Sequence, residues 1–266
     1  MNNSIGVYDS GMGGLIVLET LIKEFPHENF IFIADNKNFP YGTKTSKQIE
    51  QYNIALSNYL ISQNVKAICI ACNTASANST KLDDLVNIPI VKTIGPTVKK
   101  VAQNINNQQN NILVIATLLT IKNRTYENEL NKYFKNLPHS YYFEATQNFV
   151  NLVEEGRFGT KESFNEVKDT LEKYLNKDID KIILGCTHFS KLIPELKELF
   201  NNVEIYDSGL AIVEEVNMKL ENNLNKEHEG SITLITTGDL DLFIKQTSWF
   251  KYKDRVIYKH IDLDFE

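Results

Sequence analysis

Short, uninterrupted apolar runs alternate along this chain with longer stretches in which apolar residues recur every three to four positions. An unbroken apolar run is typical of a parallel strand buried on both faces, and the longer spacing is typical of an amphipathic helix. We expect strands at 5–8, 29–34, 66–71, 90–94, 112–116, 140–144, 181–185, 203–206, 231–236 and near 256. Helices are expected at 15–25, from a cap at Thr43 or Thr45 to about 63, at 120–135, in a segment that ends at 155, at 161–176, after 209 and after 239. This alternation predicts an α/β fold with mainly parallel sheets.

The order of the predicted elements starts again after residue 111. Cys72 follows one predicted strand and Cys186 follows another, and the strands at 90–94 and 203–206 are separated by nearly the same offset. We therefore infer two similar, doubly wound α/β halves whose strands are ordered alike. The pattern leaves open which half the segment after 209 packs against.

Composition narrows the class of protein. The 266 residues carry a net charge of −6 and 42% of them are hydrophobic, without a basic patch that would bind nucleic acid. The first residues lack the pattern of a signal peptide, and no apolar run approaches the ~20 residues that a membrane helix needs. Three cysteines, an odd number, are expected to be free thiols in a reducing cytoplasm.

Two strand ends carry a cysteine that opens a helical segment, in Ala71-Cys72-Asn73-Thr74 and in Gly185-Cys186-Thr187-His188. The unpaired N–H groups at a helix start favour a thiolate over a thiol. With a reference pKa of about 8.5, a cysteine can serve as acid or base near neutral pH. We expect the two thiols to face each other across one small acid substrate and to exchange a proton through it.

Other polar residues follow the predicted strands, where open α/β sheets bind their ligands. Hydroxyl, amide and backbone N–H groups at helix starts suit a carboxylate, while Asp9 and Asp35 can hold an ammonium group. A small molecule with both charges is an amino acid, and two opposed thiols suit inversion at its α-carbon. Since no lysine stands in a strand-end motif, a route without a covalent pyridoxal cofactor is favoured.

Two other interpretations use the same residues. Cys69, Cys72, Cys186 and His188 together would suit zinc or thiol-redox chemistry. Against this, a strand directs Cys69 and Cys72 to opposite faces, so we assign Cys69 to the core. The run Gly11-x-Gly13-Gly14 is a weak indication of a phosphate loop, because it lacks the full glycine spacing and Asp9 would repel a phosphate.

Six motifs in this order resemble the glutamate racemase family of the aspartate/glutamate racemase superfamily, over nearly the whole chain. They are Asp9-Ser10-Gly11-x-Gly13-Gly14-Leu15, Pro40-Tyr41-Gly42-Thr43, Ala71-Cys72-Asn73-Thr74-Ala75, Leu152-Val153-Glu154-Glu155-Gly156, Gly185-Cys186-Thr187-His188 and Thr236-Thr237-Gly238-Asp239.

The resemblance implies a first α/β domain of residues 1–95 plus 209–266 and a second of residues 96–208, with the active site in the cleft between them. It also implies a cytoplasmic isomerase, commonly a homodimer, that interconverts L- and D-glutamate without cofactor or metal for peptidoglycan and cell-wall biogenesis. An aspartate racemase of the same superfamily stays a close alternative, because the sequence does not show the depth of the pocket.

The resemblance also assigns roles to residues. Cys72 and Cys186 are implied as the acid/base thiols, assisted by Asp9 and His188, with Asp35 and Glu154 as further assistants. The residues implied to bind the substrate are Asp9, Ser10, Tyr41, Gly42, Asn73, Thr74, Thr117, Thr187 and His188. The chain departs from the family pattern at 144–149, 116–117 and 189–191, while both thiol motifs are intact.

Overall fold

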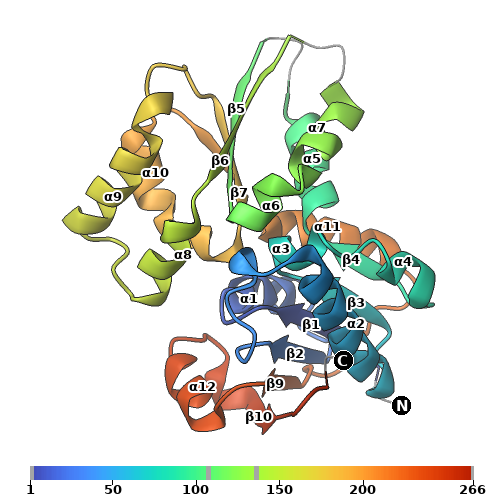
Figure 1. The fold of residues 1–266 in the computed structure, drawn as a ribbon. Coiled ribbons are helices and arrows are strands. Elements are labelled where there is room, and N and C mark those ends of the chain that lie inside the picture. Colours follow the sequence, from blue (N-terminus) through green and yellow to red (C-terminus); the bar gives the residue numbers. More distant parts are fainter. Residues whose placement is uncertain (1–2, 106–108, 135–137, 265–266) are drawn as a thin grey trace. The chain divides into compact units, whose positions relative to one another are not determined.

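The computed structural model describes residues 3–105, 109–134 and 138–264 (Figure 1). The chain divides into two compact units, one of Met1–Thr93 with Gly209–Glu266 and one of Ile94–Ser208. Each unit contains one sheet, and every strand pairing in the described residues is parallel. The predicted class, an α/β fold with mainly parallel sheets, is confirmed.

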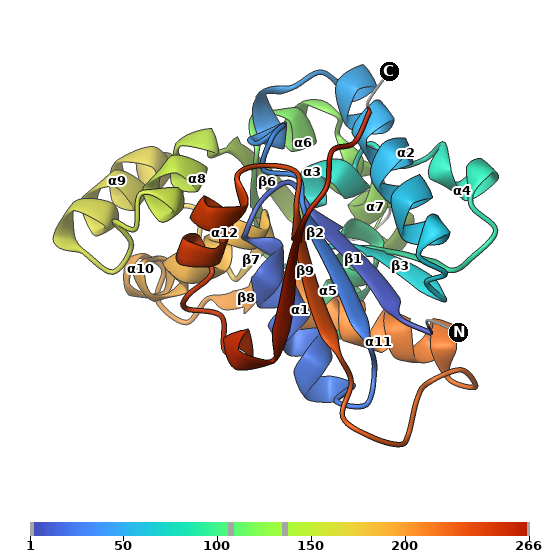
Figure 2. The same ribbon diagram turned by 90° about the horizontal axis from the view of Figure 1, so that it is seen from below.

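The first unit holds a six-stranded sheet in the order β10-β9-β2-β1-β3-β4. Its strands are β1 (Ile5–Asp9), β2 (Phe30–Ala34), β3 (Ala67–Ile70), β4 (Ile90–Lys92), β9 (Ile232–Thr236) and β10 (Val256–His260). Its helices are α1 (Gly14–Glu24), α2 (Ser46–Ser62), α3 (Asn73–Ser76), α4 (Leu82–Leu85), α11 (Ser208–Leu220) and α12 (Leu240–Gln246). Figure 2 shows β9 beside β2, so the C-terminal segment returns to the first unit, as the resemblance implied.

The second unit holds a four-stranded sheet in the order β6-β5-β7-β8. Its strands are β5 (Asn111–Ala116), β6 (Ser140–Ala145), β7 (Lys181–Gly185) and β8 (Glu204–Tyr206). Its helices are α5 (Ile94–Gln103), α6 (Leu118–Lys122), α7 (Thr125–Phe134), α8 (Gln147–Glu154), α9 (Lys161–Leu171), α10 (Ile193–Leu199) and the 3₁₀ segment η3 (Thr187–Leu192). The order β6-β5-β7-β8 repeats β2-β1-β3-β4, which confirms the predicted likeness of the halves.

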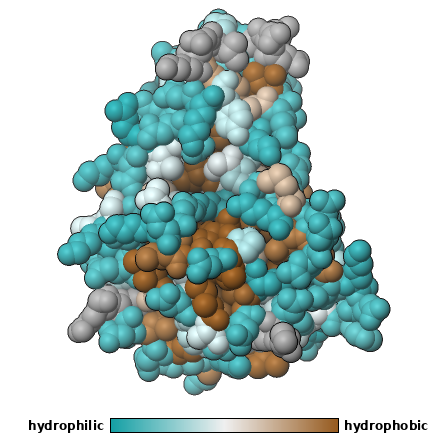
Figure 3. All heavy atoms as spheres, turned by 90° about the vertical axis from the view of Figure 1, so that its right-hand side faces the viewer, coloured by the Kyte–Doolittle hydropathy of each residue, from teal (hydrophilic) through white to brown (hydrophobic). Residues whose placement is uncertain are grey.

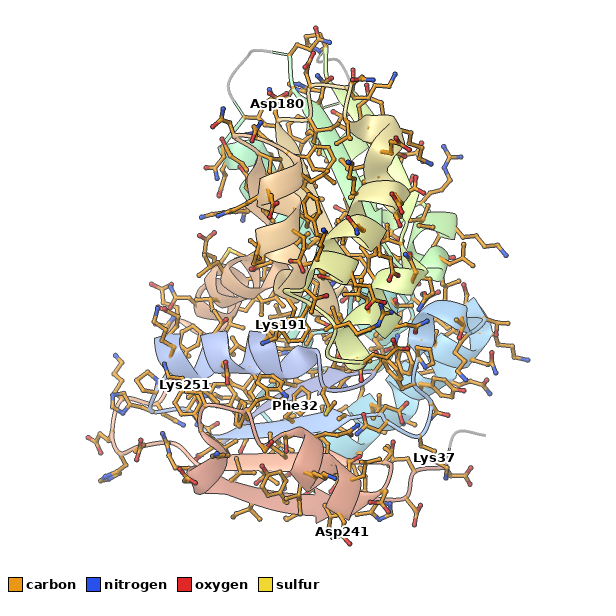
Figure 4. The ribbon with its side chains drawn as sticks, turned by 90° about the vertical axis from the view of Figure 1, so that its left-hand side faces the viewer. Phe32, Lys37, Asp180, Lys191, Asp241 and Lys251 are labelled. Atoms are coloured by element: carbon orange, nitrogen blue, oxygen red, sulfur yellow. The ribbon has the colours of Figure 1, made fainter. Side chains whose placement is uncertain are left out.

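Alternate side chains of the first sheet form the core of the first unit. Val7 and Phe32, with Leu18 from α1, are fully buried in it, and Figure 4 labels Phe32 within this sheet. Gly14 begins α1 against Asp9, because a Cβ at this position would lie 2.4 Å from the Asp9 Cβ. Glycine therefore lets α1 start directly beside the end of β1.

Local differences from the predicted elements have identifiable causes. The helix expected at 120–135 is two helices, α6 and α7, because Arg124 adopts a left-handed conformation with φ of 53°. The strand expected to reach residue 94 ends at Lys92, and Pro96 lies in the first turn of α5. The segment after Cys186 is 3₁₀ rather than α-helical.

Thr45 is the N-cap of α2, one of the two threonines expected there. Its side chain accepts from Gln48 N, and the Gln48 side chain accepts from Thr45 N, which forms a capping box. No helix among residues 3–105, 109–134 and 138–264 combines the length and the apolar character needed to span a membrane.

A buried ion pair ties the C-terminal segment to the first sheet. The Lys66 ammonium lies 2.8 Å from the Glu28 carboxylate, and their side chains are 5% and 1% exposed. The same carboxylate accepts from Asn225 N at 2.6 Å. Lys66 and Glu28 precede β3 and β2, and Asn225 lies in the segment before β9, so one charge pair joins three chain segments.

We expect Lys66→Met to lower the free energy of unfolding by about 3 kcal/mol, because it leaves the Glu28 carboxylate buried without its cation. The measurement is urea unfolding followed by circular dichroism. Lys81→Met is the matched control, since Lys81 pairs with Glu50 while its own side chain is 63% exposed. We expect the control to cost less than about 1 kcal/mol. Equal effects of the two substitutions would contradict the importance of the buried pair.

Candidate active site

Cys72 lies just beyond the carboxyl end of β3 and is the N-cap of α3. Its Sγ accepts a hydrogen bond from Ala75 N at 3.4 Å and lies 3.7 Å from Ser10 Oγ. The side chain is largely buried, with the residue 6% exposed. The predicted position of this thiol at a helix start is confirmed, and an N–H donor there favours the thiolate.

Asp9 ends β1, the strand beside β3, and is fully buried. Its Oδ2 accepts from Gly11 N and from Gly14 N, both at 3.1 Å. These two bonds hold the turn between β1 and α1, which carries Ser10. Asp9 therefore shapes the loop that presents the Ser10 hydroxyl to Cys72.

Asp35, at the carboxyl end of β2, is the centre of a buried hydrogen-bond network. Its carboxylate accepts from Tyr41 Oη at 2.5 Å, from Thr237 Oγ1 at 2.7 Å and from Asn38 Nδ2 at 3.0 and 3.1 Å. Burial raises the pKa of Asp35, while the hydrogen bonds from Tyr41, Thr237 and Asn38 oppose this shift. Burial, with the Asp35 charge and hydrogen bond, also raises the pKa of Tyr41 well above its ordinary value.

This network also contains Thr237, which was not among the site residues predicted from the sequence. Thr237 follows β9 and joins the C-terminal segment to Asp35. The available signal was its position at a strand end, within Thr236-Thr237-Gly238-Asp239. Besides the expected role toward an ammonium group, Asp35 thus fixes Tyr41 and the loop after β9.

Cys186 directly follows β7 in the second unit and begins η3, with the residue 9% exposed. Its Sγ lies 3.6 Å from His188 Nδ1, and His188 Nε2 lies 2.5 Å from Glu154 Oε1. Glu154 is the last residue of α8, which packs on η3 through an edge-to-face contact of Phe149 with Phe189. The structure thus brings together three predicted residues, Cys186, His188 and Glu154, as one hydrogen-bonded chain.

The charge state of His188 follows from this chain. Burial alone would lower the pKa of His188, but the hydrogen bonds and charges of Cys186 and Glu154 outweigh it and raise the pKa well above its ordinary value. A protonated imidazole next to a thiol stabilises the thiolate. The Cys186 site is therefore built differently from the Cys72 site, where the neighbours are a backbone N–H and a hydroxyl.

The other predicted residues also lie at carboxyl ends of strands. Thr117 follows β5, whose Ala116 pairs in register with Gly185, and its Oγ1 lies 2.9 Å from Thr120 Oγ1. The remaining predicted residues are all buried, namely Ser10, Tyr41, Gly42, Asn73, Thr74 and Thr187. Within each unit, polar groups collect around one thiol at one edge of the sheet.

The zinc or thiol-redox alternative gains no support. Cys69 is fully buried in the apolar core of the first unit, and burial raises its pKa to about 12, which disfavours the thiolate that a metal needs. All three cysteines are free. Within the part of the chain that the structure describes, no group of three or more His, Cys, Asp and Glu side chains is placed to hold a metal ion.

Comparison with known proteins agrees with the sequence motifs. Residues 16–216 match the family model described as Asp/Glu/Hydantoin racemase. A glutamate racemase of Limosilactobacillus reuteri is 38% identical over 250 residues, which cover 92% of each chain.

Two solved structures match nearly the whole chain. Glutamate racemase isoform RacE1 of Bacillus anthracis has a TM-score of 0.90 and 29% identity, covering 98% of this chain and 97% of that one. Glutamate racemase of Francisella tularensis, solved with D-glutamate, has a TM-score of 0.88 and 29% identity, covering 100% and 98%. The fold and these matches define the chain as an enzyme of the racemase class. It belongs to the Asp/Glu/hydantoin racemase family, which confirms the resemblance to glutamate racemases.

Proposed function

We propose that this enzyme interconverts L- and D-glutamate without a cofactor, using Cys72 and Cys186 as its two acid/base groups. The observation that carries the proposal is the repeated placement of a thiol in two sheets of like strand order. In each sheet a buried cysteine follows the third strand of its half, β3 or β7, and opens a helical segment. Each thiol also has its own neighbours that favour the thiolate.

The proposed reaction removes one proton from the α-carbon and then adds another to its opposite face. A thiolate on one face removes the α-proton and becomes a thiol, which leaves a carbanion at the α-carbon. The thiol on the opposite face then donates its proton to that carbon, which inverts the configuration and leaves a thiolate. No electron pair leaves the substrate, and the enzyme ends with its two thiols in exchanged protonation states.

The groups that stabilise the thiolate differ between the two cysteines. At Cys186 the donor is the His188 ring, 3.6 Å from the sulfur, and its contact with Glu154 helps to raise the pKa of His188 and so keeps the ring protonated. At Cys72 the donor is the Ala75 N–H, with Ser10 close by. The substrate carboxylates are proposed to bind the hydroxyl, amide and backbone N–H groups of Ser10, Asn73, Thr74, Thr117 and Thr187.

The proposal favours glutamate over aspartate because the whole-length relatives are named glutamate racemases, one of them solved with D-glutamate. A cytoplasmic role in supplying D-glutamate for peptidoglycan belongs to the same proposal. A homodimer is also part of it. Apolar side chains gather into a patch on the face of the molecule seen in Figure 3, a kind of surface that subunit contacts use.

The test is incubation of metal-free and cofactor-free protein with L-glutamate in D₂O. We expect α-deuterium in the NMR spectrum together with the appearance of D-glutamate. L-aspartate is the matched control substrate, and we expect it to turn over more slowly. Faster turnover of aspartate would make the protein an aspartate racemase, and no α-exchange with either acid would contradict the proposed chemistry.

A further inference from the structure

A buried asparagine on α2 reaches the short helix that Cys72 opens. Asn53 is fully buried, and its Nδ2 donates to Ala75 O at 2.9 Å and to Asn78 O at 3.0 Å. Its Oδ1 accepts from Tyr8 Oη, on β1, at 2.9 Å. One side chain thus connects α2, the first strand and the end of the segment that starts at Cys72.

The helix α3 needs such support because it is only four residues long. Its backbone bonds include Ser76 N to Cys72 O and Ala77 N to Asn73 O, both 2.9 Å. A helix this short does not persist by its own hydrogen bonds, since nucleation costs more than so few bonds return. Its geometry must therefore be held by groups outside it.

The position of α3 decides the environment of the thiol. The Ala75 N–H donates to Cys72 Sγ at 3.4 Å, and the carbonyl of the same residue accepts from Asn53. Holding the Ala75 carbonyl therefore holds the peptide segment whose N–H faces the sulfur. If that segment tilts, the thiolate loses its backbone donor.

We propose that Asn53 is a positioning residue for Cys72: its two donor bonds to the end of α3 keep the start of that helix directed at the thiol. Asn53 acts through α3 and does not contact the thiol in this network. The proposal rests on the proposed function of Cys72 as an acid/base group, but the reactivity of the thiol tests it without substrate.

Two substitutions separate the bonds of Asn53. Asn53→Asp keeps an acceptor for Tyr8 Oη and loses both donor bonds to the carbonyls. Asn53→Thr is neutral, so it buries no charge, and its one hydroxyl can replace at most one donor bond. Tyr8→Phe removes the Tyr8 donor and leaves both bonds to α3. Ser76 Oγ donates to Ile70 O, a bond that none of the three substitutions removes and that anchors the segment independently.

The measurement is the rate of alkylation by iodoacetamide as a function of pH, resolved for each cysteine by peptide mass spectrometry. We expect the pH midpoint for Cys72 to rise by about one unit in Asn53→Asp, and by less in Asn53→Thr. The midpoint for Cys186 in the same molecules is the internal reference and stays unchanged. Tyr8→Phe and the exposed control Asn58→Asp leave both midpoints unchanged.

The two buried phenols near Cys72, Tyr8 on β1 and Tyr41 after β2, do not disturb this readout. Burial raises the pKa of both, with the Asp35 charge and hydrogen bond adding to the shift of Tyr41 and the Cys72 charge adding to both. Both phenols therefore stay neutral in the range where a thiol titrates. The carboxylates of Asp9 and Asp35, at the ends of β1 and β2, are the same in every variant compared.

Each outcome decides the proposal. An unchanged Cys72 midpoint in folded Asn53→Asp and Asn53→Thr would overturn the proposal. Equal shifts at Cys72 and Cys186 would also overturn it, because they would indicate a destabilised protein rather than a displaced α3. In racemisation assays we expect kcat to fall with KM nearly unchanged. If the wild-type protein does not racemise glutamate but the midpoint shifts as expected, the proposed function fails and the positioning role stands.

Discussion

We expect serine in place of Cys72 or Cys186 to lower the rate of glutamate racemisation by about a thousandfold or more, in both directions. A serine hydroxyl is far less acidic than a thiol, so it cannot hold the conjugate base near neutral pH. In the proposed mechanism each direction of turnover uses one thiol as base and the other as acid, so the loss of either stops both. The measurement is the initial rate of D-glutamate formation and of the reverse reaction.

Cys69→Ser is the matched control, because Cys69 is a buried thiol of the same unit that points into the apolar core. We expect that variant to be less stable and to retain activity when folded.

The single variants Cys72→Ser and Cys186→Ser are also incubated with substrate in D₂O. A variant that keeps one thiol as base can still exchange the α-hydrogen of one enantiomer without inverting it. Full racemase activity in the Cys72→Ser, Cys186→Ser double variant would refute the two-thiol mechanism.

Glu154→Gln lowers kcat by about tenfold to a hundredfold, the second largest effect that we expect. Glu154 is one of the groups that raise the pKa of His188, while burial opposes them. Without the carboxylate charge, the lowering effect of burial is opposed by fewer groups, and the pKa of His188 falls. The imidazole then loses its proton as pH rises through this lower pKa, so activity declines at a pH where the wild-type rate is still level.

The sign of the stability effect follows from the same shift. Because the pKa of His188 is raised in the folded protein, its protonation stabilises the fold most at pH below the ordinary histidine pKa. This stability is lost as pH rises through the raised pKa. The wild-type protein and Glu154→Gln should therefore differ most in unfolding free energy at mildly acidic pH, where carboxylates are ionised and His188 is protonated, and converge as pH rises through the raised pKa of His188.

The matched control for this prediction is Glu155→Gln. Glu155 is the next residue along the chain, and its carboxylate pairs with Arg157 rather than with the histidine. NMR titration of the His188 ring reports its pKa in each variant. An unchanged His188 titration in Glu154→Gln would contradict the role given to the 2.5 Å contact.

The sequence predicted the strands, the repeated order of the halves and both thiol positions, because these depend on local pattern. Unbroken apolar runs occur where a strand is covered on both faces, and a cysteine after such a run lies at the edge where a parallel sheet binds its ligand. The break between α6 and α7 was not predictable in this way. It depends on the left-handed backbone of Arg124, a residue type without a strong preference for that conformation.

By itself, then, the sequence determined which residue types stand at the strand ends, and with them the class of chemistry. The tertiary structure alone decided how those residues are supported. Glu154 meets His188 across α8 and η3, Thr237 reaches Asp35 from the far end of the chain, and Asn53 holds α3 from α2. Such contacts join residues that are distant in sequence, and their geometry follows from how helices pack on a sheet. The physical reason is that a periodic pattern records which face of an element is buried, whereas a hydrogen-bond partner depends on which element covers that face.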